Sequence, residues 1–294
     1  MKINCVILNY NDADTVKNLV ERIRGYESLN QIVIVDNAST DDSVSRLRAL
    51  EDQRVVVLEA AVNGGYGAGN NLGVQYSFLT GGASHVIIAN PDVFFTEDCV
   101  EKMSRVFIRH KDVGVAAASM EDRDGCIQRN GWPIRGFCKE LLSMGPLCRR
   151  LFKRWLEYPE AYFQGKQAVY VGGVHGSMLM VEKTAFLDCG GYDEGIFLYQ
   201  EEAVLARRME QAGYRTALLL NCSYRHEHSV SIKKTYRNML ERQKLRHESV
   251  MYYFKNYLHI GPLKEWFAWM WFEILLLEIR IVMVCGRICT RRDH

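Results

Sequence analysis

The chain has 294 residues, of which 48% are hydrophobic and 24% are charged. These values are typical of a globular protein with a buried core, and they exclude disordered, collagen-like and coiled-coil chains. The net charge is +2, but residues 207–294 contain 16 Lys/Arg and 8 Asp/Glu, whereas residues 1–206 contain 21 and 27. A basic C-terminal part on an acidic body indicates an anionic partner for that part, either a membrane or a nucleic acid.

The cysteines and the N-terminal sequence bear on the cellular compartment. Nine cysteines are scattered from Cys5 to Cys289, in an odd number and without a C-x-x-C pair, which favours a reduced, cytoplasmic protein over a disulfide framework. The apolar run before Asn9 is too short for a signal peptide and is predicted to be a buried strand. No uncharged apolar stretch reaches about 18 residues, so a membrane-spanning helix is not expected.

The first 120 residues alternate strand and helix patterns, which predicts an α/β fold with a parallel sheet flanked by helices. The apolar runs expected as strands are 3–8, 31–35, 55–58, 85–89 and 114–119. Between 122 and 166 the pattern weakens and three of the five prolines occur, so substrate-facing loops are expected there. A strand at 168–181, a helix at 200–212 and a strand at 215–220 follow.

Beyond residue 231 every segment has a helical pattern, which marks a change of architecture. The sequence therefore predicts a domain at 1–231 and a helical, basic and aromatic C-terminal extension at 232–294.

Polar residues follow three of the predicted strands, where ligands bind in open parallel sheets. They are Asn9-Tyr10-Asn11, Asp36-Asn37 and Asn90-Pro91-Asp92. Any one of these alone is typical of a turn or a helix cap. Three at successive strand ends indicate a ligand site.

A glycine-rich segment, Asn63 to Gly73, precedes the third helix. It does not satisfy G-x-G-x-x-G and follows the third strand rather than the first, so it does not predict dinucleotide binding. Glycines before a helix still allow backbone N–H groups to approach a nucleotide.

Together these motifs resemble family 2 glycosyltransferases of the GT-A fold, particularly their rhamnosyltransferase-like branch. The resemblance covers about residues 1–250. It rests on an ordered set: the three strand-end motifs, the glycine-rich segment, Gly190 to Glu202, then Leu205 with Arg207, and His226 with Ser231. It implies a Rossmann-like nucleotide-binding sheet with an acceptor half.

The resemblance also implies roles on the donor side. It makes Asp92 the ligand of a divalent cation, Mg²⁺ or Mn²⁺, at the diphosphate of a nucleotide-sugar donor, and it places His226 near the same cation; His228 is an alternative to His226. Asp36 is expected to contact the pyrimidine base, with Asn9 beside it, and Asn70 is expected to contribute to nucleotide binding.

The catalytic base of an inverting transfer accepts the proton of the acceptor hydroxyl. In the family this base is the Asp of a Glu-Asp pair, but this chain has Glu201-Glu202, and the later Asp is Val204. The motif register assigns the base to Glu202, and like charges at neighbouring positions are expected to raise the pKa of one glutamate. Two solvated glutamates at a helix start are the alternative.

The acceptor side is assigned by the same resemblance. The segment from Tyr170 to Ser177 leads into it, and His175, Gly176 and Tyr199 are expected there. His175 is unusual for the family, and a structural hydrogen bond is an equal alternative for it.

The C-terminal extension carries a charge stripe and an aromatic cluster. Glu273, Arg280 and Arg287 recur every seven residues, and three tryptophans fall within six residues: Trp266, Trp269 and Trp271. Such a helix can lie in a membrane interface with its tryptophans at headgroup depth, form an oligomer contact, or pack on the domain; the tryptophan cluster favours the first two over the third. A nucleic-acid role is disfavoured because no binding motif accompanies the charge.

The sequence therefore predicts a metal-dependent, inverting glycosyltransferase that is cytoplasmic and peripheral to the inner face of the membrane. The donor would be a nucleotide-sugar, with dTDP-rhamnose as one candidate and UDP-galactofuranose or another UDP-sugar as alternatives. The acceptor would be a glycan or lipid-linked glycan of the cell envelope. From a different class, a catalytically inert sugar-nucleotide-binding subunit stays open, because Glu202 and Val204 depart from the family pattern.

Overall fold

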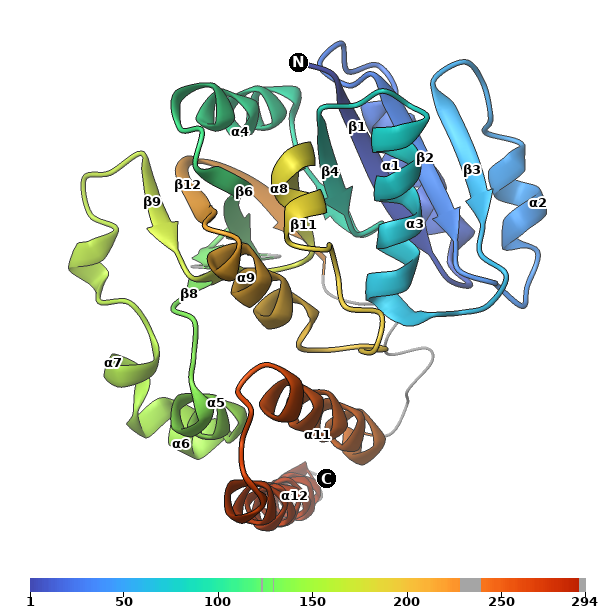
Figure 1. Cartoon of the computed structure of the whole chain (residues 1–294). Helices are drawn as coiled ribbons and strands as arrows, with labels where there is room; N and C mark the ends of the chain where they lie inside the picture. The colour runs from blue at the N-terminus through green and yellow to red at the C-terminus, as the bar shows by residue number, and fades with distance from the viewer. Residues whose placement is uncertain (123, 129, 228–238, 291–294) are drawn as a thin grey trace. The chain divides into compact units, whose positions relative to one another are not determined.

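The computed structural model describes residues 1–122, 124–128, 130–227 and 239–290. The chain forms two compact units (Figure 1). Unit 1 comprises Met1–Ile134 and Pro159–Thr235, and unit 2 comprises Arg135–Tyr158 and Tyr236–His294. Each unit is described by itself.

The N-terminal half of unit 1 alternates strands and helices as predicted. In chain order its elements are β1 (Ile3–Asn9), α1 (Ala13–Ile23), β2 (Gln31–Asp36), α2 (Ser43–Arg48), β3 (Val55–Glu59), α3 (Gly65–Leu79) and β4 (His85–Ala89). The four strands are parallel and lie in the order β3-β2-β1-β4. Their apolar runs are buried, and α1 covers them with Val16, Leu19 and Ile23 at helical spacing.

The remainder of unit 1 completes a ten-stranded sheet, whose main path is β3-β2-β1-β4-β11-β6-β12-β5. Its elements are β5 (Val93–Phe94), α4 (Glu97–Arg109), β6 (Val113–Glu121), β7 (Ile127–Gln128), β8 (Gly131–Trp132), η1 (Glu160–Tyr162), β9 (Ala168–Val171), β10 (Gly173–Val174), β11 (Met178–Glu182), α8 (Lys183–Asp188), α9 (Glu201–Gln211) and β12 (Arg215–His226). β8 and β10 form a separate two-stranded sheet.

The strands predicted in the first 120 residues run parallel, but the whole sheet is mixed because β11, from a later part of the chain, joins them in the opposite direction. β11 lies between β4 and β6 and is antiparallel to both, and Met178 pairs with Ala89 at the end of β4. Residues 175–177 therefore lie at the edge where the parallel strands end. A buried strand looks the same in sequence whichever way it runs, so its direction was not predictable from the apolar pattern.

Two expectations were wrong in detail. The single strand expected at 168–181 is divided into β9, β10 and β11, and a Cβ at Gly172 would lie 2.2 Å from the backbone nitrogen of Ile134. The segment expected to form loops, 122–166, contains three short helices: α5 (Phe137–Met144), α6 (Pro146–Leu151) and α7 (Lys153–Leu156).

Unit 2 combines α5, α6 and α7 with α11 (Met239–Asn256) and α12 (Pro262–Thr290). Phe272 of α12 stacks on His247 of α11 with ring centroids 4.3 Å apart, and Trp271 donates a hydrogen bond to the carbonyl of Leu141 in α5. Residues 135–158 therefore belong to the same unit as the C-terminal helices. The division of the sequence at 231/232 into a transferase domain and a C-terminal extension stays a prediction.

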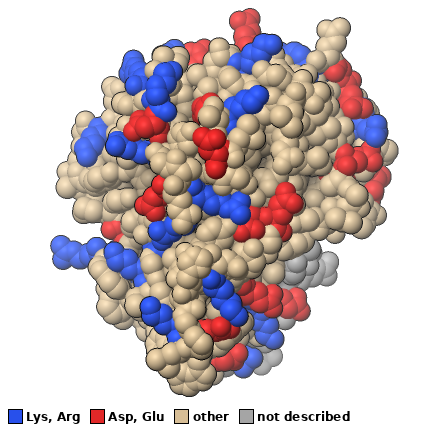
Figure 2. Space-filling view, in the orientation of Figure 1, with Lys and Arg blue, Asp and Glu red and all other residues tan. Residues whose placement is uncertain are grey.

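Two further observations concern the surface and α12. Figure 2 shows Lys/Arg and Asp/Glu side chains interspersed over the face in view, with broad uncharged areas between them. Among the described helices, α12 included, none combines the length and hydropathy that crossing a bilayer requires.

Candidate active site

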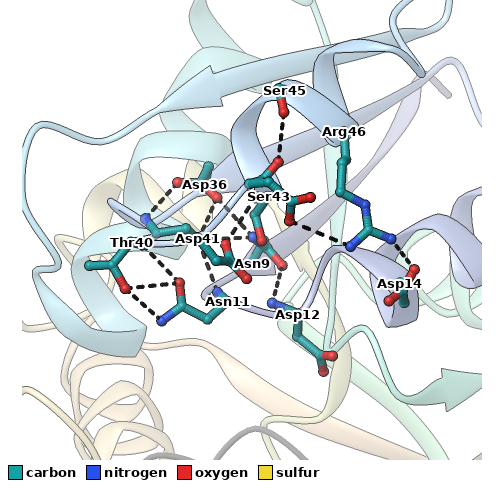
Figure 3. A network of polar contacts seen from close by, with 12 residues as sticks. Asn9, Asn11, Asp12, Asp14, Asp36, Thr40, Asp41, Ser43, Ser45 and Arg46 are labelled. Atoms are coloured by element: carbon teal, nitrogen blue, oxygen red, sulfur yellow. Dashed lines mark hydrogen bonds and ion pairs between the residues drawn. The ribbon is translucent and has the colours of Figure 1, made fainter.

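A network of hydrogen bonds joins the ends of β1 and β2 (Figure 3). Asn9 and Asp36 pair in the register of these parallel strands, so both side chains reach the same edge of the sheet. Asp36 is fully buried, and its Oδ2 accepts hydrogen bonds from Asn9 Nδ2 at 2.8 Å and from Ser39 Oγ at 2.7 Å. The backbone nitrogen of Ser39 donates to Oδ1 at 2.8 Å. Both oxygens of Asp36 are thus held by the protein itself, and its contact with a base stays a prediction.

The loops after β1 and β2 are tied to each other. Thr40 N donates to Asn11 Oδ1 at 2.8 Å, and Asn11 Nδ2 donates to Thr40 Oγ1 at 3.2 Å. Asn11 and Ala38 have φ angles of 53° and 58°, a left-handed conformation that costs a residue with a Cβ about 1–2 kcal/mol. Such backbone conformations persist where surrounding contacts determine them, as these hydrogen bonds do.

Asn37 links this edge to the glycine-rich segment. Its Nδ2 donates to Asn63 Oδ1 at 2.9 Å and to the carbonyl of Gly65 at 3.0 Å. Its Oδ1 is buried and accepts no hydrogen bond from the described residues, as is also true of Oδ1 of Asn70. The sequence placed Asn37 at a strand end but gave it no role. Two buried amide oxygens with unused acceptor capacity make Asn37 and Asn70 candidate ligand contacts.

Glycine is required where α3 begins. Gly65 has φ +84°, and a Cβ there would lie 2.1 Å from the carbonyl oxygen of Phe197. Further along α3, Asn71 holds the Gly190–Glu194 turn, because its Nδ2 donates to the carbonyl of Tyr192 and its Oδ1 accepts from the nitrogen of Tyr192. The glycine-rich segment therefore positions the loop that leads to the two glutamates.

The structure brings Asp92 and His226 together across 134 residues of sequence. His226 pairs with Val93 in the β12–β5 ladder, and its Nε2 lies 3.2 Å from Asp92 Oδ1. The two side chains are 13% and 5% exposed. The alternative His228, and Ser231 of the motif, lie outside the described residues.

This pair fits a divalent cation in donor chemistry. A carboxylate oxygen and an imidazole nitrogen both bind Mn²⁺, and the carboxylate suits Mg²⁺. The described residues hold no group of three or more His, Cys, Asp or Glu side chains that could bind a metal. A cation at Asp92 and His226 would therefore need oxygens from a ligand such as a diphosphate.

His175 lies beside this pair. Its ring centroid is 5.6 Å from that of His226, and its Nδ1 is 2.9 Å from Ser177 Oγ. Ser177 Oγ is in turn 2.6 Å from the hydroxyl of Tyr224. The structural hydrogen bond considered for His175 is therefore present, and its ring also adjoins the candidate cation site.

Gly176 joins His175 to the glutamates. Its carbonyl accepts a hydrogen bond from the Tyr66 hydroxyl at 2.6 Å, and its nitrogen donates to Glu202 Oε1 at 3.2 Å. A Cβ at this position would lie 3.0 Å from that same oxygen, so a side chain here would displace Glu202. Tyr66 was not singled out in the sequence, because nothing in its local pattern distinguishes it from a core tyrosine.

The two glutamates occupy different environments. Glu201 is 6% exposed, whereas Glu202 is half-buried and faces Gly176. Consecutive helical residues point about 100° apart, which turns one side chain inward and the other toward the 175–177 loop. Burial, together with the adjacent Glu202 carboxylate, raises the pKa of Glu201 well above its ordinary value of 4.5. The raised pKa expected for one of the pair therefore falls on Glu201.

The backbone before these glutamates is in the left-handed region. Tyr199 and Gln200 have φ angles of 69° and 71°, and Gln200 is the N-cap of α9. Arg208 braces the preceding turn by donating to the carbonyls of Gly190 and Gly191 and by pairing with Asp193 at 3.2 Å. The resemblance gives the motif arginine to the neighbouring Arg207, which pairs with Glu210 at 3.1 Å.

Comparisons of the sequence with known proteins identify the family. The pattern of the family described as "Glycosyl transferase family 2" matches residues 5–187. A relative named low-salt glycan biosynthesis hexosyltransferase Agl10, from Haloferax volcanii, is 25% identical over 68% of this chain and 59% of its own length. An N-acetylglucosaminyl-diphospho-decaprenol L-rhamnosyltransferase of Mycobacterium tuberculosis is 27% identical over 66% of each chain. The matches thus span less than two thirds of these relatives' own lengths.

Solved structures share the fold at low sequence identity. A mannosyltransferase from Pyrobaculum calidifontis, in complex with GDP-Man and Mn²⁺, matches 99% of this chain and 79% of its own with a TM-score of 0.58 and 14% identity. TarS 1–349 from S. aureus, in complex with UDP, matches 90% of this chain and 77% of its own with a TM-score of 0.55 and 14% identity. The expected GT-A fold with a C-terminal helical region is confirmed.

Proposed function

The chain belongs to glycosyl transferase family 2, and from this premise we propose that it transfers a sugar, with inversion, from a nucleotide-diphosphate donor to a lipid-linked glycan. The observation that carries the proposal is one chain of contacts in unit 1. It runs from Asp92 through His226 and His175 to Gly176, which donates to Glu202. A site for the leaving diphosphate and a carboxylate for the acceptor hydroxyl are thereby linked through two consecutive residues, His175 and Gly176.

On this proposal the base is Glu202. Its carboxylate accepts the proton of the acceptor hydroxyl while that oxygen bonds to C1 of the donor sugar, and the nucleoside diphosphate leaves from the opposite face of the ring. The raised pKa of Glu201 favours the neutral form of that buried carboxyl and so limits the negative charge beside the base. Gly176 N holds one oxygen of Glu202, which orients the carboxylate.

Asp92 and His226 would hold a divalent cation, which when bound would neutralise part of the negative charge on the departing diphosphate. Support comes from their 3.2 Å contact and from the Mn²⁺ in the P. calidifontis complex. The edge formed by Asn9, Asp36, Asn37 and Asn70 would bind the nucleoside.

The sugar is proposed to be L-rhamnose from dTDP-rhamnose, and the acceptor a sugar carried on a polyprenyl diphosphate. This proposal is supported by the name of the M. tuberculosis relative, an L-rhamnosyltransferase acting on N-acetylglucosaminyl-diphospho-decaprenol. We place the enzyme at the cytoplasmic face of a membrane, with α12 at the interface. Trp266 and Trp269 of that helix are 62% and 42% exposed, as interfacial anchors require.

A donor screen tests this function. Nucleoside diphosphate release is measured across UDP-, dTDP- and GDP-sugars with Mg²⁺ or Mn²⁺, using an N-acetylglucosaminyl-diphospho-polyprenol analogue as acceptor. We expect the fastest release with dTDP-rhamnose, a chelator-sensitive rate and a product of inverted anomeric configuration by NMR. Faster release from UDP-galactofuranose would mean that this sugar nucleotide, and not dTDP-rhamnose, is the donor. Retention of configuration would reject Glu202 as an inverting base.

A second candidate is a sugar-nucleotide-binding subunit without catalysis. It is favoured by Val204, which is fully buried where the family carries an Asp after the Glu-Asp pair. Nucleotide binding without turnover of any donor in the screen would support it.

A further inference from the structure

We propose that residues 146–156 of unit 2, which form α6, α7 and the residue between them, are a second membrane-docking element. With the outer face of α12 they would bind the surface of a bilayer that contains anionic lipids. The proposal rests on the membrane placement given above, and it adds a surface that lies far from α12 in sequence.

The first observation is an exposed apolar set in this short segment. Leu147, Leu151, Phe152 and Trp155 are 60%, 70%, 44% and 50% exposed. Single exposed apolar residues are normal on a protein surface, but four large ones within nine residues form a cluster, which is typical of a binding surface. Within unit 2 the segment buries Leu156, so it is anchored while the other four face outward.

The second observation is its charge. Residues 145–156 contain four cations and no acidic residue: Arg149, Arg150, Lys153 and Arg154. Arg149 and Lys153 lie 3.4 and 4.0 Å from the carboxylate of Glu157. Within the described parts of the chain, Arg150 and Arg154 form no ion pair, so their charge is available to an anionic surface.

The third observation is the outer stripe of α12, six exposed apolar residues that lie within about 60° of one line along the helix. They are Leu263, Trp266, Phe267, Met270, Ile274 and Leu277. The opposite side, with Ala268, Phe272 and Leu275, is buried within unit 2. Truncating α12 would expose its packing partners, so substitutions on the stripe are the cleaner test.

The two elements adjoin each other within unit 2. The nitrogen of Leu147, in the first turn of α6, donates to Glu278 Oε1 of α12 at 3.3 Å. A Cβ at Gly145 would lie 2.8 Å from Leu275. The exposed residues of α6 therefore begin beside the part of α12 that carries Ile274 and Leu277.

A bilayer fits this surface better than a second copy of the chain. In a two-fold dimer the same surface meets itself, which would bring the four cations of one copy against those of the other. Anionic headgroups compensate that charge, and the apolar residues and Trp155 can enter the headgroup region, as amphipathic interfacial segments do.

The test uses the full chain and vesicle co-sedimentation, with phosphatidylcholine vesicles that contain or lack phosphatidylglycerol. Each cation near an anionic surface contributes about fivefold to the partition coefficient, so Arg150→Glu with Arg154→Glu should lower binding to the anionic vesicles at least about 25-fold. Leu151→Ser with Phe152→Ser should lower it about tenfold or more. The matched control, Arg109→Glu with Lys111→Glu, makes the same charge change at exposed positions of unit 1 and should leave binding near the wild-type value.

Unchanged melting temperatures would show that the variants fold. Unchanged turnover on a soluble acceptor analogue would show that a loss of vesicle binding does not depend on the transferase activity. Wild-type binding by both α6–α7 variants, with loss of binding only on Trp266→Ser with Met270→Ser, would overturn this inference and leave α12 as the anchor. No binding by the intact chain would overturn the inference and the membrane placement together. A dimer that both α6–α7 variants break, without vesicle binding, would assign the surface to self-association and overturn the inference as well.

Discussion

The hydrogen-bond network at the ends of β1 and β2 and the pair Glu201–Glu202 differ in how far the protein supplies hydrogen-bond donors to the carboxylates. Both oxygens of Asp36 accept hydrogen bonds from Asn9 or Ser39. In the pair, Glu201 Oε2 is buried and accepts no hydrogen bond from the described residues. The ends of β1 and β2 thus form a hydrogen-bonded support, whereas at the glutamates burial and the neighbouring Glu202 raise the pKa of Glu201. A carboxyl with a raised pKa beside a second carboxylate is typical of sites for proton transfer.

The largest effect should come from Glu202, whose carboxylate faces residues 175–177. Glu202→Gln keeps the shape and the contact with Gly176 N but removes proton affinity, so turnover should fall about 10²–10⁴-fold with donor binding intact. Initial rates and nucleotide titrations measure the two quantities. If Glu201→Gln shows this loss and Glu202→Gln does not, the buried glutamate is the base and the comparison is reversed.

Loss of the candidate cation ligand should rank next. Asp92→Ala removes the carboxylate beside His226, and losing several kcal/mol of charge stabilisation corresponds to about 10³-fold in turnover. Nucleoside diphosphate affinity in the presence of Mn²⁺ should weaken at least several-fold, and affinity in a chelator should change little. Unchanged metal-dependent turnover would reject the assignment of Asp92.

A substitution in the strand-end network should act on stability more than on chemistry. Asp36→Asn places an amide NH₂ against hydrogen-bond donors, which should lower the free energy of unfolding by about 1–3 kcal/mol. Denaturant unfolding measures this loss. The control Asp124→Asn, at an exposed position of the turn between β6 and β7 and outside this network, should change stability by less than about 0.5 kcal/mol. Equal effects of the two substitutions would show that the hydrogen bonds of Asp36 do not stabilise the fold.

The sequence predicted some parts of this site and not others. That Asn9, Asp36 and Asp92 lie at one edge of the sheet was predictable, because apolar runs fix the parallel strands and the ends of such strands meet at one edge. The contact of His226 with Asp92 depends on a ladder between β12 and β5, and only the family motif pointed to it.

The different environments of the glutamates were not readable from the sequence. Two adjacent glutamates are equivalent in a pattern of letters, and the rotation of α9 alone decides which is buried. The grouping of residues 135–158 with the C-terminal helices was missed for a related reason. α6 and α7 have six and four residues, too few for a helical period, and their partners lie more than one hundred residues away.

The smallest effect concerns the pH dependence of stability at Glu201. Its pKa in the folded protein is raised above 4.5 by burial and by Glu202, so above pH 4.5 the unfolded chain loses a proton that the folded protein keeps. The free energy of unfolding therefore falls as pH rises from 4.5 toward the raised pKa, with a slope of at most about 1.4 kcal/mol per pH unit. Glu201→Gln removes this titration, so its stability should fall less from pH 4.5 to neutrality, as measured by denaturant unfolding. The control Glu210→Gln, at an exposed position of the same helix, should retain the wild-type slope. A slope in Glu201→Gln equal to that of the wild type would mean that Glu201 ionises freely in the folded protein, and the contrast with the strand-end network would lose its basis.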